Sequence, residues 1–246
     1  MRKLLSPFIV VAFLATLPAW AEAPAAAPAP YLTPEQVDLM TLLPPPPQAG
    51  SKAQENDLAM VLDVQRHRTQ HDKDGAIAEG DASVFHMADV LGPNFTPEKL
   101  PKFAAFIQRV MKTTSPLYRG VKNHYERPRP FVGSAKVHAI PSLQQGEYEK
   151  DKHAYTFSYP SGHATFGAVY AILLSQMVPE KREALFERGW EYGQHRVAAG
   201  MHYPFDVQSG RIDGTVIAYA LMKNPEFQKD FAAAKAELRS VLGLAP

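Results

Sequence analysis

The stretch SGHATFGAVYAILLSQMV, from Ser161 to Val178, is almost entirely apolar and decides the fold. A helix that is apolar on all sides is either buried in a protein core or spans a membrane. No other stretch after residue 21 could pair with it as a second membrane span, so a central buried helix is predicted. Ser161 is a natural N-cap for this helix.

Other segments place apolar residues at helical spacing. The predicted helices cover residues 56–69, 81–91, 103–111, 179–199, 213–222 and 226–242. Thr96 followed by Pro97 is interpreted as the N-cap and first position of the helix that continues through residues 103–111. No alternating run indicates a strand, and no internal repeat is visible. We therefore predict an all-α, single-domain helical bundle over residues 31–246.

The first residues have the pattern of a targeting signal. Arg2 and Lys3 precede an apolar run over residues 4–17, and Ala19-Trp20-Ala21 fits an A-x-A cleavage site. The run is shorter than the roughly 20 residues that span a bilayer, which favours a cleaved signal peptide over a membrane anchor. The prediction is a signal peptide over residues 1–21, an Ala/Pro linker over 22–30, and a periplasmic protein without stable membrane insertion.

Charge and cysteine content exclude several function classes. Of the 26 basic residues, Arg2 and Lys3 leave with the signal peptide, so 24 remain against all 25 acidic residues, a formal net charge of −1. Proteins that bind nucleic acid normally have a basic excess, so no nucleic-acid partner is expected. The chain has no cysteine, which excludes thiolate metal sites and cysteine nucleophiles.

The start of the apolar helix, Pro160-Ser161-Gly162-His163, is suited to an anion. The free N–H groups of a first helical turn, together with the helix dipole, favour negative charge. Gly162 lets the backbone approach a ligand closely because it lacks a Cβ. His163 lies in the same turn and could transfer a proton. Taken alone, these four residues could equally be an ordinary capped helix start.

Two further segments add cationic and proton-transferring groups. Lys122 and Arg129 occur in KNHYERPRP (122–130), where the prolines are expected to keep the strip extended. Arg196, His202 and Asp206 occur in RVAAGMHYPFD (196–206). An aspartate four residues after a histidine could hydrogen-bond one ring nitrogen and leave the other free as a nucleophile. Separately, each segment could be a solvated surface; together they form a phosphate-binding set.

The order and spacing of the three segments resemble the type 2 phosphatidic acid phosphatase (PAP2) superfamily, which includes the vanadium haloperoxidases. The chain is most similar to its bacterial class A non-specific acid phosphatases, also in Ser158-Tyr159 before the helix cap and in the segment 188–194. One departure is His195, where that family usually has serine before the arginine. Its role is open.

The resemblance implies hydrolysis of phosphate monoesters with broad specificity through a phosphohistidine, without a metal or cofactor and with inhibition by vanadate. His202 would be the nucleophile, His163 the general acid and base, and Asp206 the orienting carboxylate. The phosphate oxygens would be held by Lys122, Arg129, Ser161, Gly162 and Arg196. A homo-oligomer, such as a dimer, would fit the family.

Two other functions remain open from the sequence. A vanadate-dependent haloperoxidase would use the same donors to hold vanadate. A non-catalytic periplasmic oxyanion-binding protein would need the donors but no orienting aspartate. His67 and His71 have the spacing of a helical metal pair, but without further ligands in view they are interpreted as a solvated helix face.

Overall fold

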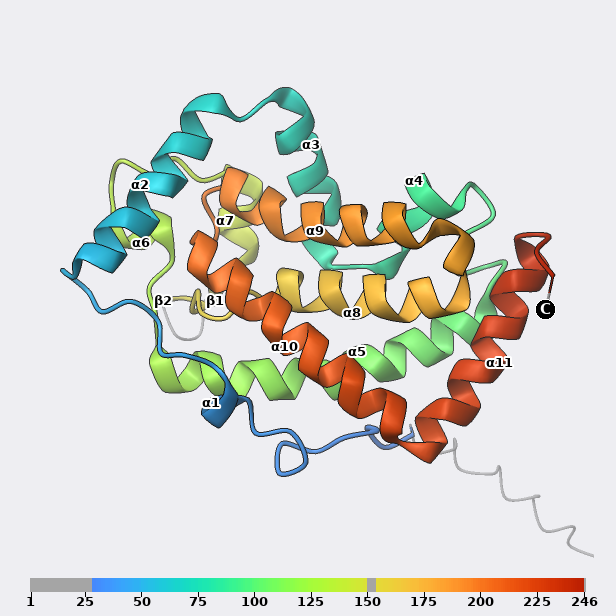
Figure 1. Cartoon of the computed structure of the whole chain (residues 1–246). Coiled ribbons are helices and arrows are strands. Elements are labelled where there is room, and N and C mark those ends of the chain that lie inside the picture. The colour runs from blue at the N-terminus through green and yellow to red at the C-terminus, as the bar shows by residue number, and fades with distance from the viewer. Residues whose placement is uncertain (1–27, 150–153, 246) are drawn as a thin grey trace, which may run out of the picture.

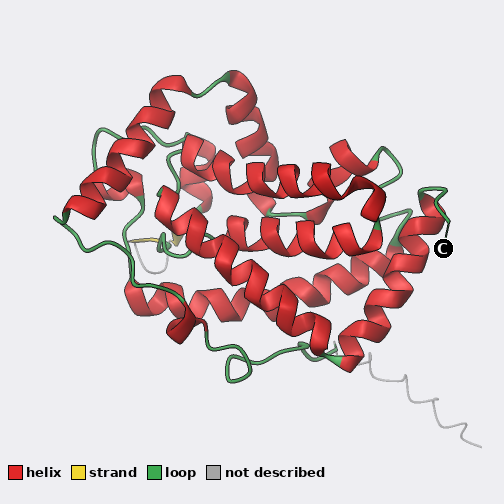
Figure 2. Ribbon diagram, viewed as in Figure 1, coloured by secondary structure: helices red, strands yellow, loops and turns green. Residues whose placement is uncertain are grey.

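The computed structural model describes residues 28–149 and 154–245, and helices dominate this part of the chain (Figure 2). The predicted all-α fold is confirmed. The predicted signal peptide, residues 1–21, and residues 22–27 of the linker lie outside the described residues. Within the described residues, no helix combines the length and the apolar character that crossing a bilayer requires.

Helix α8 (Gly162–Met177) is the centre of the fold, as predicted. Ser161 caps it, with its Oγ accepting the Ala164 N–H at 3.3 Å. α9 (Arg182–Ala198) runs alongside it, and α10 (Pro204–Lys223) crosses it obliquely (Figure 1). The short 3₁₀ helix η4 (Pro179–Lys181) joins α8 to α9. The main core cluster surrounds α8 with apolar side chains that come from as far apart as Tyr31 and Leu238.

Close helix contact depends on glycine. A Cβ on Gly214 of α10 would fall inside van der Waals contact of the Thr165 carbonyl oxygen, and a Cβ on Gly210 would do the same to that of Ser161. These two positions let α10 lie directly against the first turns of α8. The crossing in turn fixes where the residues before α10 sit relative to the start of α8.

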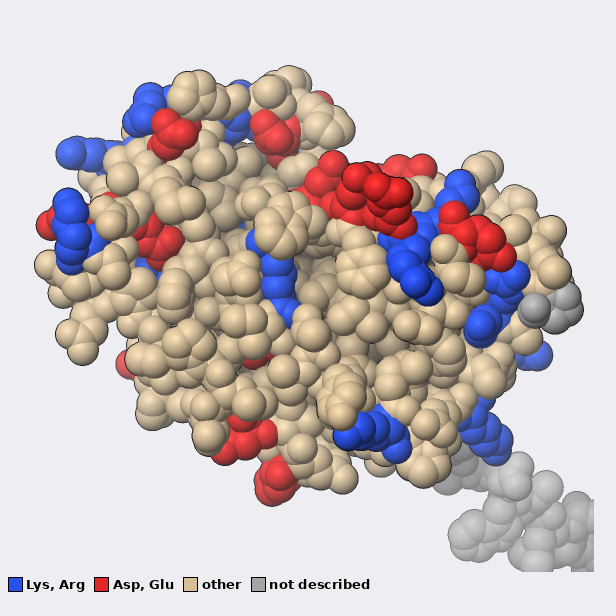
Figure 3. All heavy atoms as spheres, in the orientation of Figure 1, with Lys and Arg blue, Asp and Glu red and all other residues tan. Residues whose placement is uncertain are grey.

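The remaining long helices enclose this centre. α5 (Pro101–Tyr125) packs against α11 (Pro225–Val241), whereas α2 (Lys52–His67) and α3 (Gln70–Ala78) contact α9. Figure 3 shows acidic side chains gathered over α9, where Glu183, Glu187 and Glu191 are exposed. The short elements are α1 (Leu39–Leu42), η1 (Glu79–Asp81), η2 (Val84–Met87), α4 (Ala88–Leu91), α6 (Pro130–Gly133) and α7 (Pro141–Gly146).

Several predicted boundaries were wrong. The helix expected from Thr96 begins at Pro101 instead, because proline disfavours helical backbone in the residue before it, and Leu100 is non-helical (φ −130°, ψ 54°). That helix runs on to Tyr125 rather than ending at residue 111. The helix expected over 56–69 starts at Lys52 and ends at His67, because Thr69 caps α3 in a capping box with Asp72.

Two other local predictions also needed correction. The single helix expected over 81–91 is divided between η1, η2 and α4, with Ala82 in the left-handed region (φ 55°) between the first two. No strand was expected, yet β1 (Tyr148–Glu149) and β2 (Ala154–Tyr155) form an antiparallel hairpin in which Tyr148 pairs with Tyr155. Strands of two residues are too short to produce an alternating pattern.

The glycine crossing predicts that Gly214→Ala destabilises the protein by about 1–3 kcal/mol, because the added methyl group pushes α10 away from α8. Gly120→Ala in α5 is the matched control, since nothing lies within 4 Å of its Cβ. That control should leave stability unchanged or raise it by up to about 1 kcal/mol. Urea denaturation of the two variants measures both. Equal stability of the two variants would contradict a tight crossing.

Candidate active site

The N-terminal end of α8 lies next to the β1–β2 hairpin (Figure 1). Residues of both, among them Gly162 and Glu149, line a cavity of about 450 Å³. Its walls include five of the residues singled out from the sequence: Lys122, Arg129, Gly162, His163 and His202. A second cavity of about 250 Å³ shares Arg129, His163 and His202 and adds Arg196. The two cavities therefore form one continuous site, to which residues far apart in the chain contribute.

His202 lies just before α10, and its ring is oriented by hydroxyl and carboxylate groups behind it. Nδ1 is 3.3 Å from Ser158 Oγ, and Ser158 Oγ donates to Asp206 Oδ2 at 2.6 Å. The direct distance from His202 Nδ1 to Asp206 Oδ2 is 3.6 Å, longer than a hydrogen bond. The sequence predicted a direct bond; in the structure, Ser158 bridges the pair and the carboxylate acts at slightly longer range.

The other ring nitrogen of His202 lies on the cavity side, where Arg129 Nη1 is 3.1 Å from Nε2. With the proton on Nδ1, which can then donate to Ser158, Nε2 carries the lone pair and accepts from Arg129. Burial and the Arg129 charge lower the pKa of His202 to about 3. The imidazole is therefore neutral in mildly acidic and neutral solution and is able to act as a nucleophile.

Asp206 is held by a buried arginine to which the sequence analysis assigned no role. Arg127 Nη1 contacts Asp206 Oδ1 at 2.6 Å, and its Nη2 contacts Asp57 Oδ2 at 2.7 Å. Its guanidinium also lies over the Tyr203 ring, with Cζ 4.0 Å from the centroid. Burial would raise the pKa of Asp206, but the neighbouring His202 ring and the Arg127 charge lower it to about 2. The carboxylate is thus ionised throughout the range in which the protein would work.

His163 faces the cavity from the first turn of α8. Its Nε2 donates to the backbone carbonyl of Glu79 at 3.0 Å, which leaves Nδ1 as the nitrogen available to exchange a proton with a ligand. Burial, together with the charge of Arg196 and the neighbouring His202 ring, lowers its pKa below the ordinary value for histidine. The proton on Nδ1 is therefore weakly held in the empty site.

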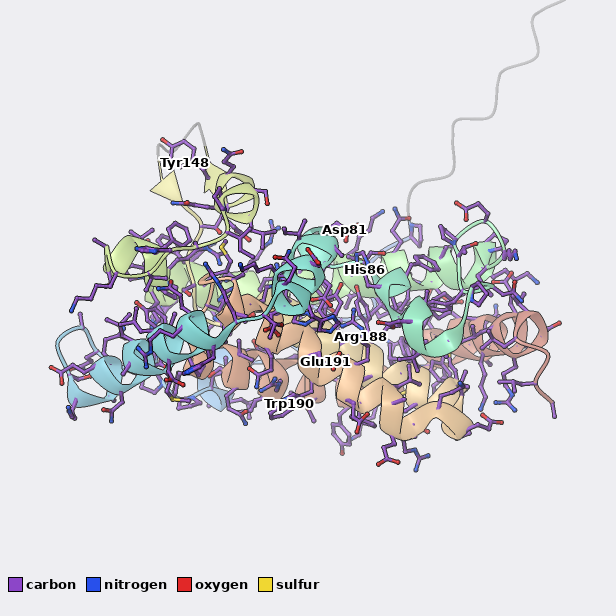
Figure 4. All side chains as sticks on the ribbon, turned by 90° about the horizontal axis from the view of Figure 1, so that it is seen from above. Asp81, His86, Tyr148, Arg188, Trp190 and Glu191 are labelled. Carbon is purple, nitrogen blue, oxygen red and sulfur yellow. The ribbon has the colours of Figure 1, made fainter. Side chains whose placement is uncertain are left out.

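The Glu79 carboxylate is fully buried and is the anchor of a second ion-pair network, also missed from the sequence. Oε1 lies 2.6 Å from Arg188 Nη1, and Oε2 lies 2.9 Å from His195 Nδ1. Figure 4 shows Arg188 close to Asp81, at the end of η1, and to His86 of η2. His195 thus has a defined partner: it helps to fix the segment whose backbone carbonyl orients His163.

Two cations, the part-buried Lys122 and the buried Arg129, line the site. Lys122 Nζ donates to the carbonyl oxygens of Phe157 at 2.7 Å and Ser158 at 3.2 Å. Burial and the nearby Arg129 charge lower the pKa of Lys122 to about 7. Arg129 contacts His202, Thr156, the Met201 carbonyl and Glu147. Two desolvated cations this close to each other favour binding of an anion between them.

The last three predicted residues complete the anion site. Arg196 donates to the Ala76 carbonyl, while its buried Nε has no hydrogen-bond partner among the described residues. Gly162 lines the cavity at the start of α8. Its neighbour Ser161 is buried, with its N–H bonded to the Asp206 carbonyl at 3.0 Å. The structure therefore brings all eight predicted residues together, six on the cavity walls and Ser161 and Asp206 directly behind them.

The described residues can be compared with the ligand sets that hold metal ions in proteins. Within residues 28–149 and 154–245, no group of three or more His, Asp or Glu side chains is arranged to hold a metal ion. His67, considered as part of a metal pair, instead contacts the backbone carbonyl of Asp63 through Nδ1 at 3.0 Å.

Comparison with known proteins identifies the family. Residues 104–230 match the PAP2 superfamily. The chain belongs to the PAP2 superfamily. It is 33% identical to a non-specific acid phosphatase of Providencia stuartii, over 96% of this chain and 98% of the relative. It is also similar to a non-specific acid phosphatase of Salmonella typhi (32% identical, 85% and 84% covered) and to an acid phosphatase of Zymomonas mobilis (31%, 82% and 75%).

The resemblance predicted from the three segments is thereby confirmed, and the relatives belong to the enzyme class that the sequence predicted. The PAP2 match spans every predicted site residue, from Lys122 to Asp206. Asp57 and Glu79, which anchor Arg127 and orient His163, precede the matched region. In this PAP2 protein, two supports of the site are therefore provided by α2 and η1, outside the matched segment.

The lowered pKa of Lys122 predicts how anion binding depends on pH. The ammonium is present below about pH 7 and is lost above it, so affinity for a dianion should begin to fall as the pH rises through about 7. Sulfate is a suitable probe because its own charge is constant between about pH 5 and pH 9. Lys122→Arg keeps its charge over this range and should remove the fall near pH 7. Calorimetric titration measures both proteins; the same decline in the variant would contradict the assignment to Lys122.

Proposed function

We propose that this acid phosphatase hydrolyses phosphate monoesters of broad structure through a phosphohistidine on His202, without a metal or cofactor. The observation that best supports this is a neutral imidazole whose Nε2 carries a lone pair on the cavity side, where Arg129 and Lys122 also line the wall. The acid phosphatase relatives support the same class of reaction. The expected substrates are small molecules such as nucleotides, sugar phosphates and aryl phosphates.

In the first step, Arg129 Nη1 releases His202 Nε2 and turns to a phosphate oxygen, and the Nε2 lone pair attacks phosphorus and forms the N–P bond. The bond from phosphorus to the ester oxygen breaks, and this oxygen takes the proton that His163 carries on Nδ1. In the second step, a water molecule attacks phosphorus while the neutral His163 accepts its proton. The N–P bond then breaks and returns its electron pair to His202, which releases phosphate.

The surroundings of His202 support both steps. When the N–P bond forms, the imidazole becomes positively charged, and the Asp206 carboxylate stabilises that charge through Ser158 and at 3.6 Å. The non-bridging oxygens would be held by Lys122, Arg129, Arg196, the Ser161 hydroxyl and the Gly162 N–H. These donors are fixed before substrate arrives, so they stabilise the charge that gathers on phosphoryl oxygens in the transition state.

The preference for acid follows from His163. The first step needs His163 protonated, and its pKa is below the ordinary value because the ring is buried beside Arg196 and His202. The protonated fraction therefore rises as the pH falls through the acid range. A bound phosphate dianion works in the same direction, since its negative charge favours the protonated ring.

Neither alternative from the sequence is favoured by a specific observation. A haloperoxidase would oxidise bromide when vanadate is added, whereas a phosphatase would only be inhibited by it. An oxyanion carrier would have no use for the Ser158–Asp206 relay behind His202, which supports turnover rather than storage. The expected dimer remains a prediction that the molecular mass in solution would test.

Export to the periplasm is part of the proposal. It is supported by the basic start, apolar run and A-x-A site of residues 1–21. Cleavage after Ala21 would make Glu22 the first residue of the mature protein, and N-terminal sequencing of protein from the periplasmic fraction tests this. Protein that retains Met1 in a membrane fraction would instead indicate an anchor.

The nucleophile assignment predicts that His202→Ala lowers kcat for p-nitrophenyl phosphate by about a thousandfold or more. The exposed His138→Ala is the matched histidine control and should retain the wild-type rate. Hydrolysis by the wild type should survive excess EDTA, be greatest in acid and be suppressed by vanadate. Wild-type turnover by a folded His202→Ala protein would refute the mechanism, and loss of activity in EDTA would refute metal independence.

A further inference from the structure

The cavity-facing guanidinium of Arg129 is already fully engaged in the empty site. Nε donates to the Thr156 carbonyl at 3.0 Å, and Nη1 donates to the Met201 carbonyl at 2.9 Å and to His202 Nε2 at 3.1 Å. Nη2 contacts the Thr156 hydroxyl at 2.8 Å and Glu147 Oε2 at 2.7 Å. Glu147 is the only anion in this set. Attack by His202 Nε2 requires Arg129 Nη1 to release it, so a phosphate oxygen can take that N–H from His202. A phosphate can also pair with Nη2 only by replacing the Thr156 hydroxyl or Glu147 there.

Glu147 reaches the site from the end of α7, directly before β1. The Thr156 N–H donates to the Glu147 carbonyl at 2.9 Å, which extends the pairing of the β1–β2 hairpin by one rung. The Thr156 hydroxyl also donates to the Glu147 carboxylate. Figure 4 shows the neighbouring residue, Tyr148, on the hairpin that projects from the helices. The hairpin thus presents a carboxylate to a site formed by the helices.

The position of the Glu147 carboxylate is one that an anionic ligand would use. It lines both cavities, next to Arg129, His163 and His202. Burial would raise the pKa of Glu147, but the charges of Arg129 and Lys122 and the Thr156 hydrogen bond lower it to about 2. It is therefore a full negative charge at working pH. A second anion placed beside it would be repelled in this poorly solvated site.

We propose that Glu147 is an internal competitor for the phosphate site: its carboxylate neutralises Arg129 when the site is empty and leaves Nη2 when a phosphoryl group pairs with both terminal nitrogens of Arg129. The inference rests on the proposed function of the cavity. It makes Glu147 a residue that determines affinity and specificity. A ligand must offer more than the single charge of a carboxylate to displace it, which favours phosphoryl dianions over monoanions.

The same competition acts on the product. After hydrolysis, inorganic phosphate occupies the site in which Glu147 can pair with Arg129. The return of the carboxylate offsets the loss of the phosphate contacts, so the product is released more easily than from a site that would be left with unpaired buried cations. Glu147 therefore limits product inhibition at a cost in substrate affinity.

The test is the inhibition constant of inorganic phosphate for Glu147→Gln, measured with p-nitrophenyl phosphate in acid. The amide keeps the shape and can still accept from Thr156, but it has no charge with which to compete. The inhibition constant should fall by about tenfold, and KM should fall with it. Glu147→Ala, which removes the contact entirely, should also bind phosphate more tightly.

Glu149→Gln is the matched control, because it removes the same charge from the same hairpin at a residue that lines only the larger cavity, whereas Glu147 lines both. It should change the inhibition constant by less than about twofold. An unchanged or weaker inhibition constant in both Glu147 variants would overturn the inference, as would equal tightening in Glu149→Gln. The wild type is assayed in parallel. If it hydrolyses the substrate while the variants give either of these contradicting results, only the role of Glu147 is refuted and the proposed function stands.

Discussion

The buried ion pair between Arg127 and Asp206 is the interaction on which the site depends. Asp206 is completely inaccessible to solvent, and a carboxylate there is tolerated because Arg127 neutralises it. The same arginine binds Asp57 of α2, so one guanidinium links α2, the strip after α5 and the first turn of α10. Asp206 in turn holds Ser158 and, through its backbone carbonyl, the N–H of Ser161. The position of His202 and the start of α8 are therefore set by one charge pair.

Charge balance explains the other features of the site. Three cations, the part-buried Lys122 and the buried Arg129 and Arg196, line the site with two histidines, and their pKa values are all lower than usual because desolvation disfavours their charged forms. Glu79 and Glu147 offset part of this charge on opposite sides. A phosphoryl dianion offsets the remainder. Keeping these groups charged in the empty site costs free energy. Binding of the phosphoryl group recovers that free energy, which then contributes to stabilising the transition state.

Much of this arrangement could be predicted from the sequence, because periodicity and local capping carry the information. The α8 helix was predicted with its cap at Ser161. The eight candidate site residues, which the structure brings together, could be proposed because motifs fix residue types at short spacing. Glu79 and Glu147 could not be found, because their roles depend on contacts such as Glu79 with His195, 116 residues apart. The hairpin that carries Glu147 was invisible for a different reason: strands of two residues leave no pattern.

The central claim is that a phosphoryl group is carried on His202 Nε2 during turnover. Rapid quenching in base during hydrolysis of a phosphate monoester, followed by proteolysis and mass spectrometry, tests it directly, because phosphohistidine survives in base. The account predicts that the phosphorylated peptide contains His202, with the phosphate on Nε2. Turnover without any phosphorylated intermediate, or phosphate on His163 instead, would contradict it.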